Sequence, residues 1–413
     1  MKKAKMMKKY ADLIAVVGIH ANPKQDVIIK APVEAYEFAR YLALRLYANK
    51  ARSVKVDYYD SALKKQYLIH EVPSRLDEIA EWEVQREIER TDRNCALINL
   101  IGDDPAMFNN VNPSRIKRRN KAEVSAFNPL KKPYHNNELA WCIAAVPTKG
   151  WAKRIFPELS PTQGVLKLWK LINEACYITE DSDPIENWKE HIETLEKRAE
   201  VLNNYQFKTL HYISKESGTD INIGLVDNHI WSAAKSIQSR NGLEFVPNIP
   251  TQEVFTCPDR NRIDGVVYSS RPLSYHGTII DKFYLEFKDG VVVSFKAQKG
   301  MDALEEIVNF DDGSCSLGEV ALIPYDSPIS KQHVIYQETL FDENASCHLA
   351  LGQSFVENIV NGETMDDNEL LIRGCNQSMM HVDFMIGTKD MFIEGIKEDG
   401  ERVTIFKDGN FTF

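Results

Sequence analysis

The stretch DVIIKAPVEAYEFARYLALRLYANKARSVKVDYYD, residues 26–60, carries the pattern that decides the fold of the N-terminal part of this chain. Its two ends, DVIIKAP and SVKVDYYD, are rich in β-branched and aromatic residues and are bounded by turn formers, as is typical of strands. Between them, the segment from Val33 to Ala51 repeats apolar residues such as Phe38, Leu42 and Leu46 at helical spacing. A strand, a helix and a second strand in this order predict parallel pairing, with the helix covering the sheet.

The same alternation extends on both sides of this stretch. DLIAVVGI, residues 12–19, and CALINLIG, residues 95–102, have strand-like composition. The segment after residue 60 has a helical pattern that is interrupted at Pro73, and helical patterns return at residues 161–176 and 186–205. We therefore predict an α/β N-terminal domain with a largely parallel sheet over residues 1–205.

After about residue 206 strand-like runs separated by turn residues dominate. Examples are DINIGL, GVVYSS, TIIDKFYLEFKDGVVVSFKAQKG and MFIEGIKEDGERVTIFKDGNFTF. Asp289-Gly290, between two apolar runs, is a strong hairpin signal. We predict a second, mainly antiparallel β domain over residues 206–413, barrel-like and carrying the functional site.

Composition excludes several classes of protein. The net charge of −10 argues against a nucleic-acid partner, and no apolar stretch reaches the ~18–20 residues that a membrane span needs. Seven scattered cysteines without a CxxC pair indicate reduced thiols rather than a disulfide framework. The N-terminal MKKAKMMKKYADLIAVVGI lacks the long apolar core and cleavage site of a signal peptide. We expect a cytoplasmic protein with neither nucleic-acid nor membrane partners.

Potential metal ligands stand in short segments of the second half of the chain. They are Glu253 in TQEVFT, Glu319 in LGEVAL, Glu343 and His348 in FDENASCH, and His381 and Asp383 in HVDFMIG. Four carboxylates and two imidazoles suit two adjacent divalent cations, because their four negative charges offset two doubly charged ions. Two such cations about 3.5–4 Å apart lower the pKa of a shared water to roughly 7, which yields a nucleophile for hydrolysing amides and esters.

Each of these segments, taken singly, can also be explained without a metal site. His381 and Asp383 are two residues apart and would share one face of a strand, but such a pair also arises by chance. Glu343 and His348 are joined by a segment that could equally be a solvated acidic loop. Glu319 precedes apolar VALI, and a buried glutamate has to be paired or metal-bound.

Other catalytic motifs are absent from the sequence. There is no GxSxG elbow, no GxxxxGK[ST] phosphate loop and no HExxH zinc motif. Cys347 and His348 do not form a catalytic dyad, because neighbours on an extended chain point to opposite faces.

In combination, segments along nearly the whole chain resemble the thermophilic-type metalloaminopeptidases, the family of aminopeptidase T, aminopeptidase S and aminopeptidase II. The resemblance is carried by ADLIAVVGI, EAYEFAR, the DDP at residues 103–105, AAVPTKGWAKRIFP, LWKLI, GTDINIGL, NIPTQEVFT, RPLSYHGTII, LGEVALIPYDSPIS, TLFDENASCHLALG and HVDFMIG. It implies a metal-dependent aminopeptidase that acts on short peptides, a cytoplasmic homodimer, and a two-metal centre in the C-terminal domain.

The resemblance also implies roles for particular residues. The positions that match the family's metal ligands are Glu253, Glu319, Glu343, His348, His381 and Asp383. Of these, Glu319 is expected to bridge the ions, and Glu319 and Glu343 are the expected catalytic carboxylates, although which carboxylate carries the proton stays open. Zinc or cobalt are the implied metals, and the ligand types would also admit manganese or magnesium.

Position 355 departs from the family pattern. The family has an active-site tyrosine seven residues after the histidine that matches His348, and this chain has Phe355 there. Without a hydroxyl, Phe355 can neither donate a hydrogen bond nor ligate a metal. Two alternatives therefore stay open: a catalytically weakened homologue that binds peptides or metal, and a dinuclear hydrolase of another amide.

Overall fold

The computed structural model describes residues 1–275 and 277–413, so that His276 in the RPLSYHGTII segment lies outside the described residues. The chain forms two compact units. The first comprises Met1–Lys189 with Lys235–Ile249, and the second comprises Glu190–Ala234 with Pro250–Phe413. The expected division into independent domains at residues 205 and 206 stays a prediction.

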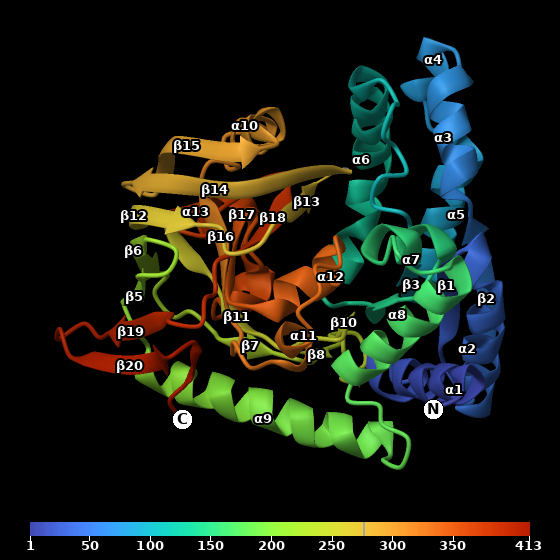
Figure 1. Cartoon of the computed structure of the whole chain (residues 1–413), viewed down its shortest axis with the longest axis horizontal. Helices are drawn as coiled ribbons and strands as arrows, with labels where there is room; N and C mark the ends of the chain where they lie inside the picture. The colour runs from blue at the N-terminus through green and yellow to red at the C-terminus, as the bar shows by residue number, and fades with distance from the viewer. Residues whose placement is uncertain (276) are drawn as a thin grey trace. The chain divides into compact units, whose positions relative to one another are not determined.

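A parallel sheet organises the first unit (Figure 1). Its strands follow the order β10 (Asn248–Ile249), β4 (Trp141–Ala145), β3 (Ala96–Ile101), β1 (Asp26–Pro32) and β2 (Ser53–Tyr59). Strand β1 pairs in parallel with β2, and helix α2 (Tyr36–Ala48) joins them. The α/β class predicted from residues 26–60 is confirmed, and α2 buries Phe38, Leu42 and Leu46 as its spacing indicated.

Helices precede, connect and follow these strands along the chain. They are α1 (Lys3–Leu13), α3 (Ser61–His70), α4 (Pro73–Leu76), α5 (Glu81–Asp92), α6 (Pro113–His135), α7 (Lys149–Ile155), α8 (Pro161–Ala175) and α9 (Pro184–Tyr205), the last of which runs into the second unit. The interruption expected at Pro73 is present, because this proline begins α4, where its missing N–H costs no hydrogen bond. A small β-ladder of β8 (Ser236–Ile237) and β9 (Glu244–Phe245) also belongs to this unit.

The strand predicted at residues 12–19 is wrong. Helix α1 runs into this segment and continues as a π-helical turn over Ile14–Gly18. The reason lies upstream, because Met6, Tyr10 and Ile14 recur every four residues and are all buried. Burial of this helical stripe outweighs the strand preference of the β-branched residues in IAVVGI.

The second unit consists mainly of two antiparallel sheets. The larger follows the order β13 (Leu273–Tyr275), β14 (Thr278–Lys288), β12 (Pro258–Tyr268), β6 (Thr219–Leu225), β5 (Thr209–Ser214), β19 (Phe392–Ile396), β20 (Arg402–Lys407) and β21 (Asn410–Phe411), with β15 (Val291–Lys299) paired to β14. The smaller follows the order β18 (His381–Met385), β17 (His348–Gly352), β16 (Leu317–Leu322), β11 (Val254–Thr256) and β7 (Ser232–Ala233). Short helices α10 (Met301–Val308), α11 (Pro328–Lys331), α12 (Thr339–Asp342) and α13 (Asp367–Ile372) lie between strands.

The antiparallel class is confirmed, but the barrel is not. In the described part of the chain, neither sheet has a pairing that joins its first strand to its last. The two sheets instead share one apolar core, and the rings of Phe283 on β14 and Phe384 on β18 meet with centroids 5.8 Å apart. Each sheet thus buries one face without closing on itself. The predicted hairpin is present, with Asp289 and Gly290 at φ of 49° and 87° between β14 and β15.

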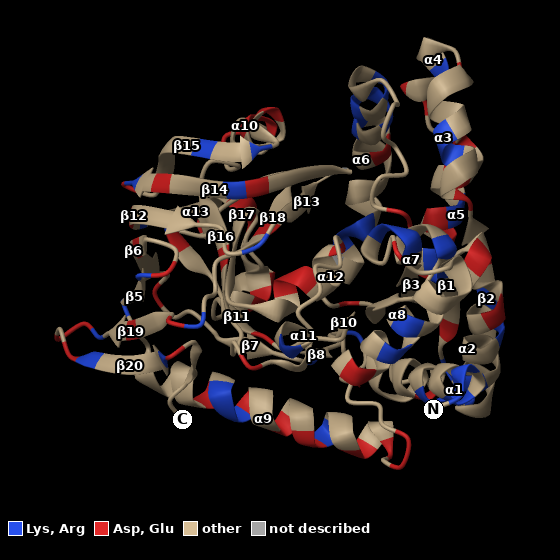
Figure 2. Ribbon diagram, viewed as in Figure 1, with Lys and Arg blue, Asp and Glu red and all other residues tan. Residues whose placement is uncertain are grey.

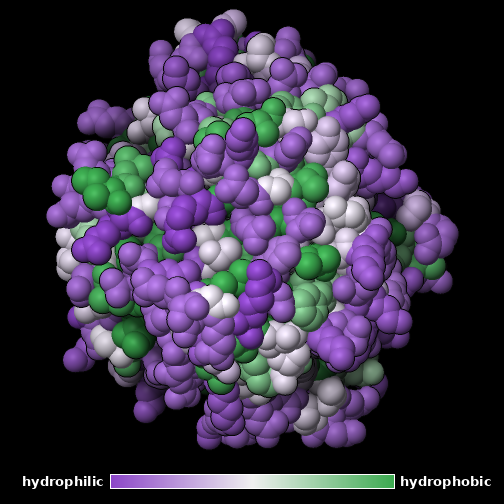
Figure 3. All heavy atoms as spheres, turned by 90° about the vertical axis from the view of Figure 1, so that its left-hand side faces the viewer, coloured by the Kyte–Doolittle hydropathy of each residue, from purple (hydrophilic) through white to green (hydrophobic). Residues whose placement is uncertain are grey.

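Surface charge is mixed in sign. Figure 2 shows basic and acidic bands alternating along α9, and basic residues concentrated on α6. The basic run KRRNK lies on α6, where Arg118 pairs with Asp77 and Arg119 pairs with Glu123. The face of the molecule in Figure 3 is mostly hydrophilic, with apolar residues scattered in small groups.

The described helices include none with the length and apolar character that crossing a membrane requires.

Candidate metal centre

One face of the smaller sheet carries the predicted ligands, and the other face is part of the core. Alternate residues such as Val320, Leu349 and Phe384 belong to the shared apolar cluster. Glu319 pairs in register with Ala350, which in turn pairs with Asp383. Because side chains alternate across a strand, Glu319, His348, His381 and Asp383 emerge together on the face opposite the core. We call this the ligand face.

A β-bulge in β16 directs Glu319 to the ligand face. Leu317 and Glu319 are two residues apart, so a regular strand would place both on one face. The pairing with β17 shifts between these two residues, and Leu317 consequently belongs to the core while Glu319 does not. Gly318 stands at the bulge, where a Cβ atom would lie 2.3 Å from the carbonyl oxygen of Gly352. Glycine is required there because another backbone approaches too closely for any side chain.

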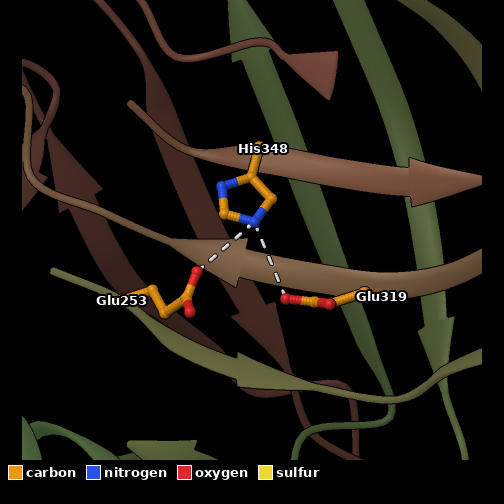
Figure 4. A group of neighbouring side chains, drawn as sticks. All are labelled: Glu253, Glu319 and His348. Carbon is orange, nitrogen blue, oxygen red and sulfur yellow. Dashed lines mark ion pairs between the residues drawn. The ribbon is translucent and has the colours of Figure 1, made fainter. Parts of the chain in front are cut away.

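Two groups of side chains converge on this face, and Glu319 belongs to both. The first comprises Glu253, Glu319 and His348, and the second comprises Glu319, His381 and Asp383. In the first, His348 Nε2 lies 3.4 Å from Glu253 Oε2 and 3.6 Å from Glu319 Oε1. Figure 4 marks these two ion pairs with dashed lines. In the second, His381 Nε2 lies 3.1 Å from Glu319 Oε2 and 3.2 Å from Asp383 Oδ1. The two oxygens of the Glu319 carboxylate thus face different imidazoles.

Backbone carbonyls orient both imidazole rings. The Nδ1 atom of His348 lies 3.0 Å from the carbonyl oxygen of Glu343, and that of His381 lies 2.7 Å from the carbonyl oxygen of Gln353. A carbonyl oxygen only accepts, so each Nδ1 donates its hydrogen and each Nε2 is directed at the carboxylates. Such second partners fix the tautomer and orientation of metal-binding histidines in proteins.

Glu343 stands slightly apart from the other predicted ligands. It begins the 3₁₀ turn η3 (Glu343–Ala345) and is a member of neither converging group. Its carboxylate accepts a hydrogen bond from Asn344 Nδ2 at 3.3 Å. Burial, together with the charges of Asp383, Glu253 and Glu319, raises the pKa of Glu343 well above its usual range. Glu343 is therefore buried near the converging groups without belonging to them.

The cluster concentrates buried charge. Glu319 is 4% exposed and Glu253 is 7% exposed, and burial is the main cause that raises the pKa of Glu253 to about 7. Burial alone would lower the pKa of His348, but a hydrogen bond with Glu319 and the charges of Glu253 and Asp383 outweigh it and raise that pKa to about 9. Carboxylates buried this closely require cations beside them. Oxygen and imidazole nitrogen donors are those that zinc, cobalt and manganese accept, so the donor set fits divalent ions.

Two aromatic side chains border the cluster. The ring of Phe355 lies against that of His381, with centroids 4.8 Å apart and planes at 51°. The ring of Phe255 meets Phe355 edge-on, with centroids 5.9 Å apart. Sequence reasoning singled out Phe355 but missed Phe255. The available signal was its position two residues after Glu253, which places both side chains on one face of the chain.

Sequence reasoning also missed the elements that orient the ligands. The carbonyl groups of Glu343 and Gln353 have no sequence signature, because every residue carries a carbonyl. Gly318 was visible as the residue before Glu319, but only the pairing with β17 shows that it makes a bulge.

Comparison with known proteins gives consistent results along the whole chain. A family model described as thermophilic metalloprotease (M29) matches residues 3–411. The chain is 38% identical over 406 residues to aminopeptidase AmpS of Bacillus subtilis, which covers 98% of each protein. It is 34% identical over 405 residues to aminopeptidase T of Thermus aquaticus, again covering 98% of each. Wild-type AmpT from Thermus thermophilus has a similar structure, with a TM-score of 0.93, 34% identity and full coverage of both chains.

Proposed function

This chain belongs to the thermophilic metalloprotease family (M29), and from that premise we propose that it is a two-metal aminopeptidase that releases the N-terminal residue of short peptides. Relatives that match it over nearly their full length are named aminopeptidases. The observation that carries the two-metal proposal is the position of Glu319, whose two carboxylate oxygens face two different imidazoles.

We assign the ligands from the two converging groups. Glu253 and His348 would hold one ion, His381 and Asp383 would hold the other, and Glu319 would bridge them. Zinc or cobalt are the proposed ions, with manganese and magnesium as the alternatives to test. When bound, such a pair supplies an ionised water and polarises the carbonyl of the bond to be cleaved.

Glu343 is our proposed proton carrier. The family resemblance makes Glu343 an expected metal ligand as well as an expected catalytic carboxylate; because it is buried beside the cluster but outside both converging groups, we propose the catalytic role for it. A carboxylate in this position can take a proton from the attacking water and deliver it to the departing amine. The Asn344 amide, which donates to Glu343 Oε1, would hold the carboxylate in place.

The site would select a free N-terminus through the α-amino group of the peptide. This group would bind one of the ions or a nearby carboxylate, and an acetyl group on it would prevent that contact. We therefore expect exopeptidase activity.

Turnover of aminoacyl-p-nitroanilides should be abolished by dialysis against a chelator and restored by zinc or cobalt, with two ions per chain measured by mass spectrometry. N-acetylated substrates should be inert. Full activity in metal-free protein would overturn the proposal.

Phe355 favours a second candidate, a weakened homologue that binds metal or peptide without efficient turnover. The same assay separates the two, since this candidate would retain both ions and fail to cleave any free-amine substrate. A dinuclear hydrolase of another amide would instead cleave N-blocked amides.

We further propose a homodimer in the cytoplasm, which follows from the family resemblance and the reduced-thiol composition. Light scattering and fractionation test these two points.

A further inference from the structure

Solvent reaches the ligand cluster mainly beside His381. The side chain of His381 is 22% exposed, whereas those of His348 and Glu319 are 2% and 5% exposed. Asp383, in the same converging group as His381, is the next most accessible of these ligands at 13%. A peptide that approaches the cluster therefore meets His381 and its neighbours first.

An aromatic pair stands on this accessible side. Phe355 packs against the His381 ring, and Phe255 meets Phe355 edge-on. Phe355 is 38% exposed, so much of its ring is open to solvent. Phe255 pairs in register with Ala321, which lies two residues after Glu319 on β16, and this places Phe255 on the ligand face. The accessible edge of a strongly charged cluster thus carries an apolar wall.

We propose that Phe255 and Phe355 form the subsite for the side chain of a peptide's first residue and select large apolar residues there. This inference rests on the proposed aminopeptidase function. The α-amino group and the carbonyl under attack belong to the first residue, and both have to reach the ligand cluster. The side chain on the intervening Cα atom is therefore held beside the cluster, where these rings stand.

The chemistry of the wall defines the preferred residues. Leucine, methionine and phenylalanine side chains bury apolar surface against the rings, and aromatic ones can add edge-to-face contacts. Glycine has no side chain to bury. The carboxylates of aspartate and glutamate would lose water of hydration against an apolar wall, which is unfavourable. We expect kcat/KM to rank leucine and phenylalanine above alanine and glycine, with the acidic residues lowest.

The test compares kcat/KM for leucyl, phenylalanyl, alanyl and glycyl p-nitroanilides in the full-length, metal-loaded protein. Because one methylene in an apolar pocket is worth roughly 10–200-fold, Phe255→Ala should lower the leucine-to-glycine ratio at least about tenfold. Phe355→Leu, at a more exposed position, is a second variant in case Phe255→Ala does not fold. Phe413→Ala is the matched control, since that ring is 44% exposed and contacts Phe411 at the C-terminus.

Binding measurements separate this inference from the aminopeptidase proposal. Leucine hydroxamate should bind the wild-type protein more tightly than glycine hydroxamate in calorimetry, and Phe255→Ala should remove that difference with metal content unchanged. If the wild-type protein binds leucine hydroxamate more tightly than glycine hydroxamate but cleaves no substrate, the subsite is supported and the proposed function is refuted. If turnover is normal and the leucine-to-glycine ratio of kcat/KM is the same in Phe255→Ala, Phe355→Leu and Phe413→Ala, the proposed function is supported and the subsite is refuted.

Discussion

Glu319 is the residue on which the two halves of the cluster depend. Its Oε1 atom faces His348 and its Oε2 atom faces His381. Glu319→Gln replaces one of these oxygens with an amide NH2 group and removes the negative charge that both proposed ions would share. We predict that this variant loses both ions, with metal content per chain falling from two towards zero in mass spectrometry.

Glu343→Gln is the matched control for this prediction. It is also a buried carboxylate, but it lies outside both converging groups. Glu343→Gln should keep at least one ion while kcat falls by a factor on the order of 10²–10⁴, which is the usual contribution of general acid–base catalysis. A Glu319→Gln protein that retains two ions would contradict the bridging role.

The missing hydroxyl at position 355 leads to a second prediction at the residue scale. Loss of one oxyanion donor typically costs on the order of 10²–10³ in kcat, but bound metals already supply much of that stabilisation. We predict that Phe355→Tyr raises kcat by about tenfold. The ring is 38% exposed, so the added oxygen can be accommodated without repacking a core.

Steady-state kinetics with metal analysis checks this gain. Metal content should be the same in Phe355→Tyr as in the wild-type protein, so that any change in kcat reflects the hydroxyl. If kcat is unchanged or falls while two ions remain bound, the absent hydroxyl does not limit catalysis. The weakened-homologue alternative would then lose its motivation.

At the scale of the strand, the bulge in β16 determines whether Glu319 reaches the site at all. Gly318→Ala would place a methyl group within 2.3 Å of the Gly352 carbonyl oxygen, a separation that real Cβ atoms do not adopt. The backbone of β16 or β17 has to move in response, and Glu319 and His348 lie on these two strands. We predict loss of metal binding together with a lower melting temperature.

Another glycine offers the comparison for Gly318→Ala. Gly400 lies in the turn between β19 and β20, where a Cβ atom would have open space around it, although its φ of 85° strains any substitution. Gly400→Ala should therefore lower stability modestly and leave metal content intact. Equal metal content in the two alanine variants would show that the bulge does not control the ligand geometry.

At the scale of the whole molecule, two buried histidines outside the ligand cluster make the fold sensitive to acid. Burial is the main cause that lowers the pKa of both His191 and His229 to about 4. In the unfolded chain each would titrate near 6.5, so the unfolded state binds more protons between pH 6.5 and 4. Stability is therefore fully present above pH 6.5 and is lost as pH falls through this window, by about 3 kcal/mol per histidine.

Thermal unfolding of the metal-free protein between pH 7 and 4 measures this loss and avoids the separate effect of metal release. His191→Gln should reduce the dependence on pH, because the Nε2 atom of glutamine can still donate to the Thr251 carbonyl oxygen that His191 Nε2 contacts at 2.8 Å. His70→Gln changes an exposed histidine and serves as the control, since both variants share the titration of the carboxyl groups. Identical pH profiles for the two variants would refute the role of His191.

The local sequence pattern was sufficient to predict much of the secondary structure of this protein. The strand–helix–strand segment at residues 26–60 folds as predicted, because its apolar spacing and its turn residues both act over a few residues. The hairpin at Asp289-Gly290 forms for the same reason. The predicted ligand residues could be singled out because carboxylates and histidines among apolar residues are rare enough to stand out. The convergence of Glu319, His348, His381 and Asp383 follows from strand alternation once the strands are paired.

Only the tertiary structure decided the remaining features, and each depends on partners distant in sequence. Residues 12–19 became helical because burial of Met6, Tyr10 and Ile14 outweighed a local strand preference. The β domain stayed open because two sheets share one core instead of one sheet closing on itself. The face of Glu319 depends on the pairing of β16 with β17, and the aromatic wall depends on Phe255 and Phe355, 100 residues apart, meeting beside His381. Local sequence determines which chemistry is available, whereas packing between distant strands determines where each group points.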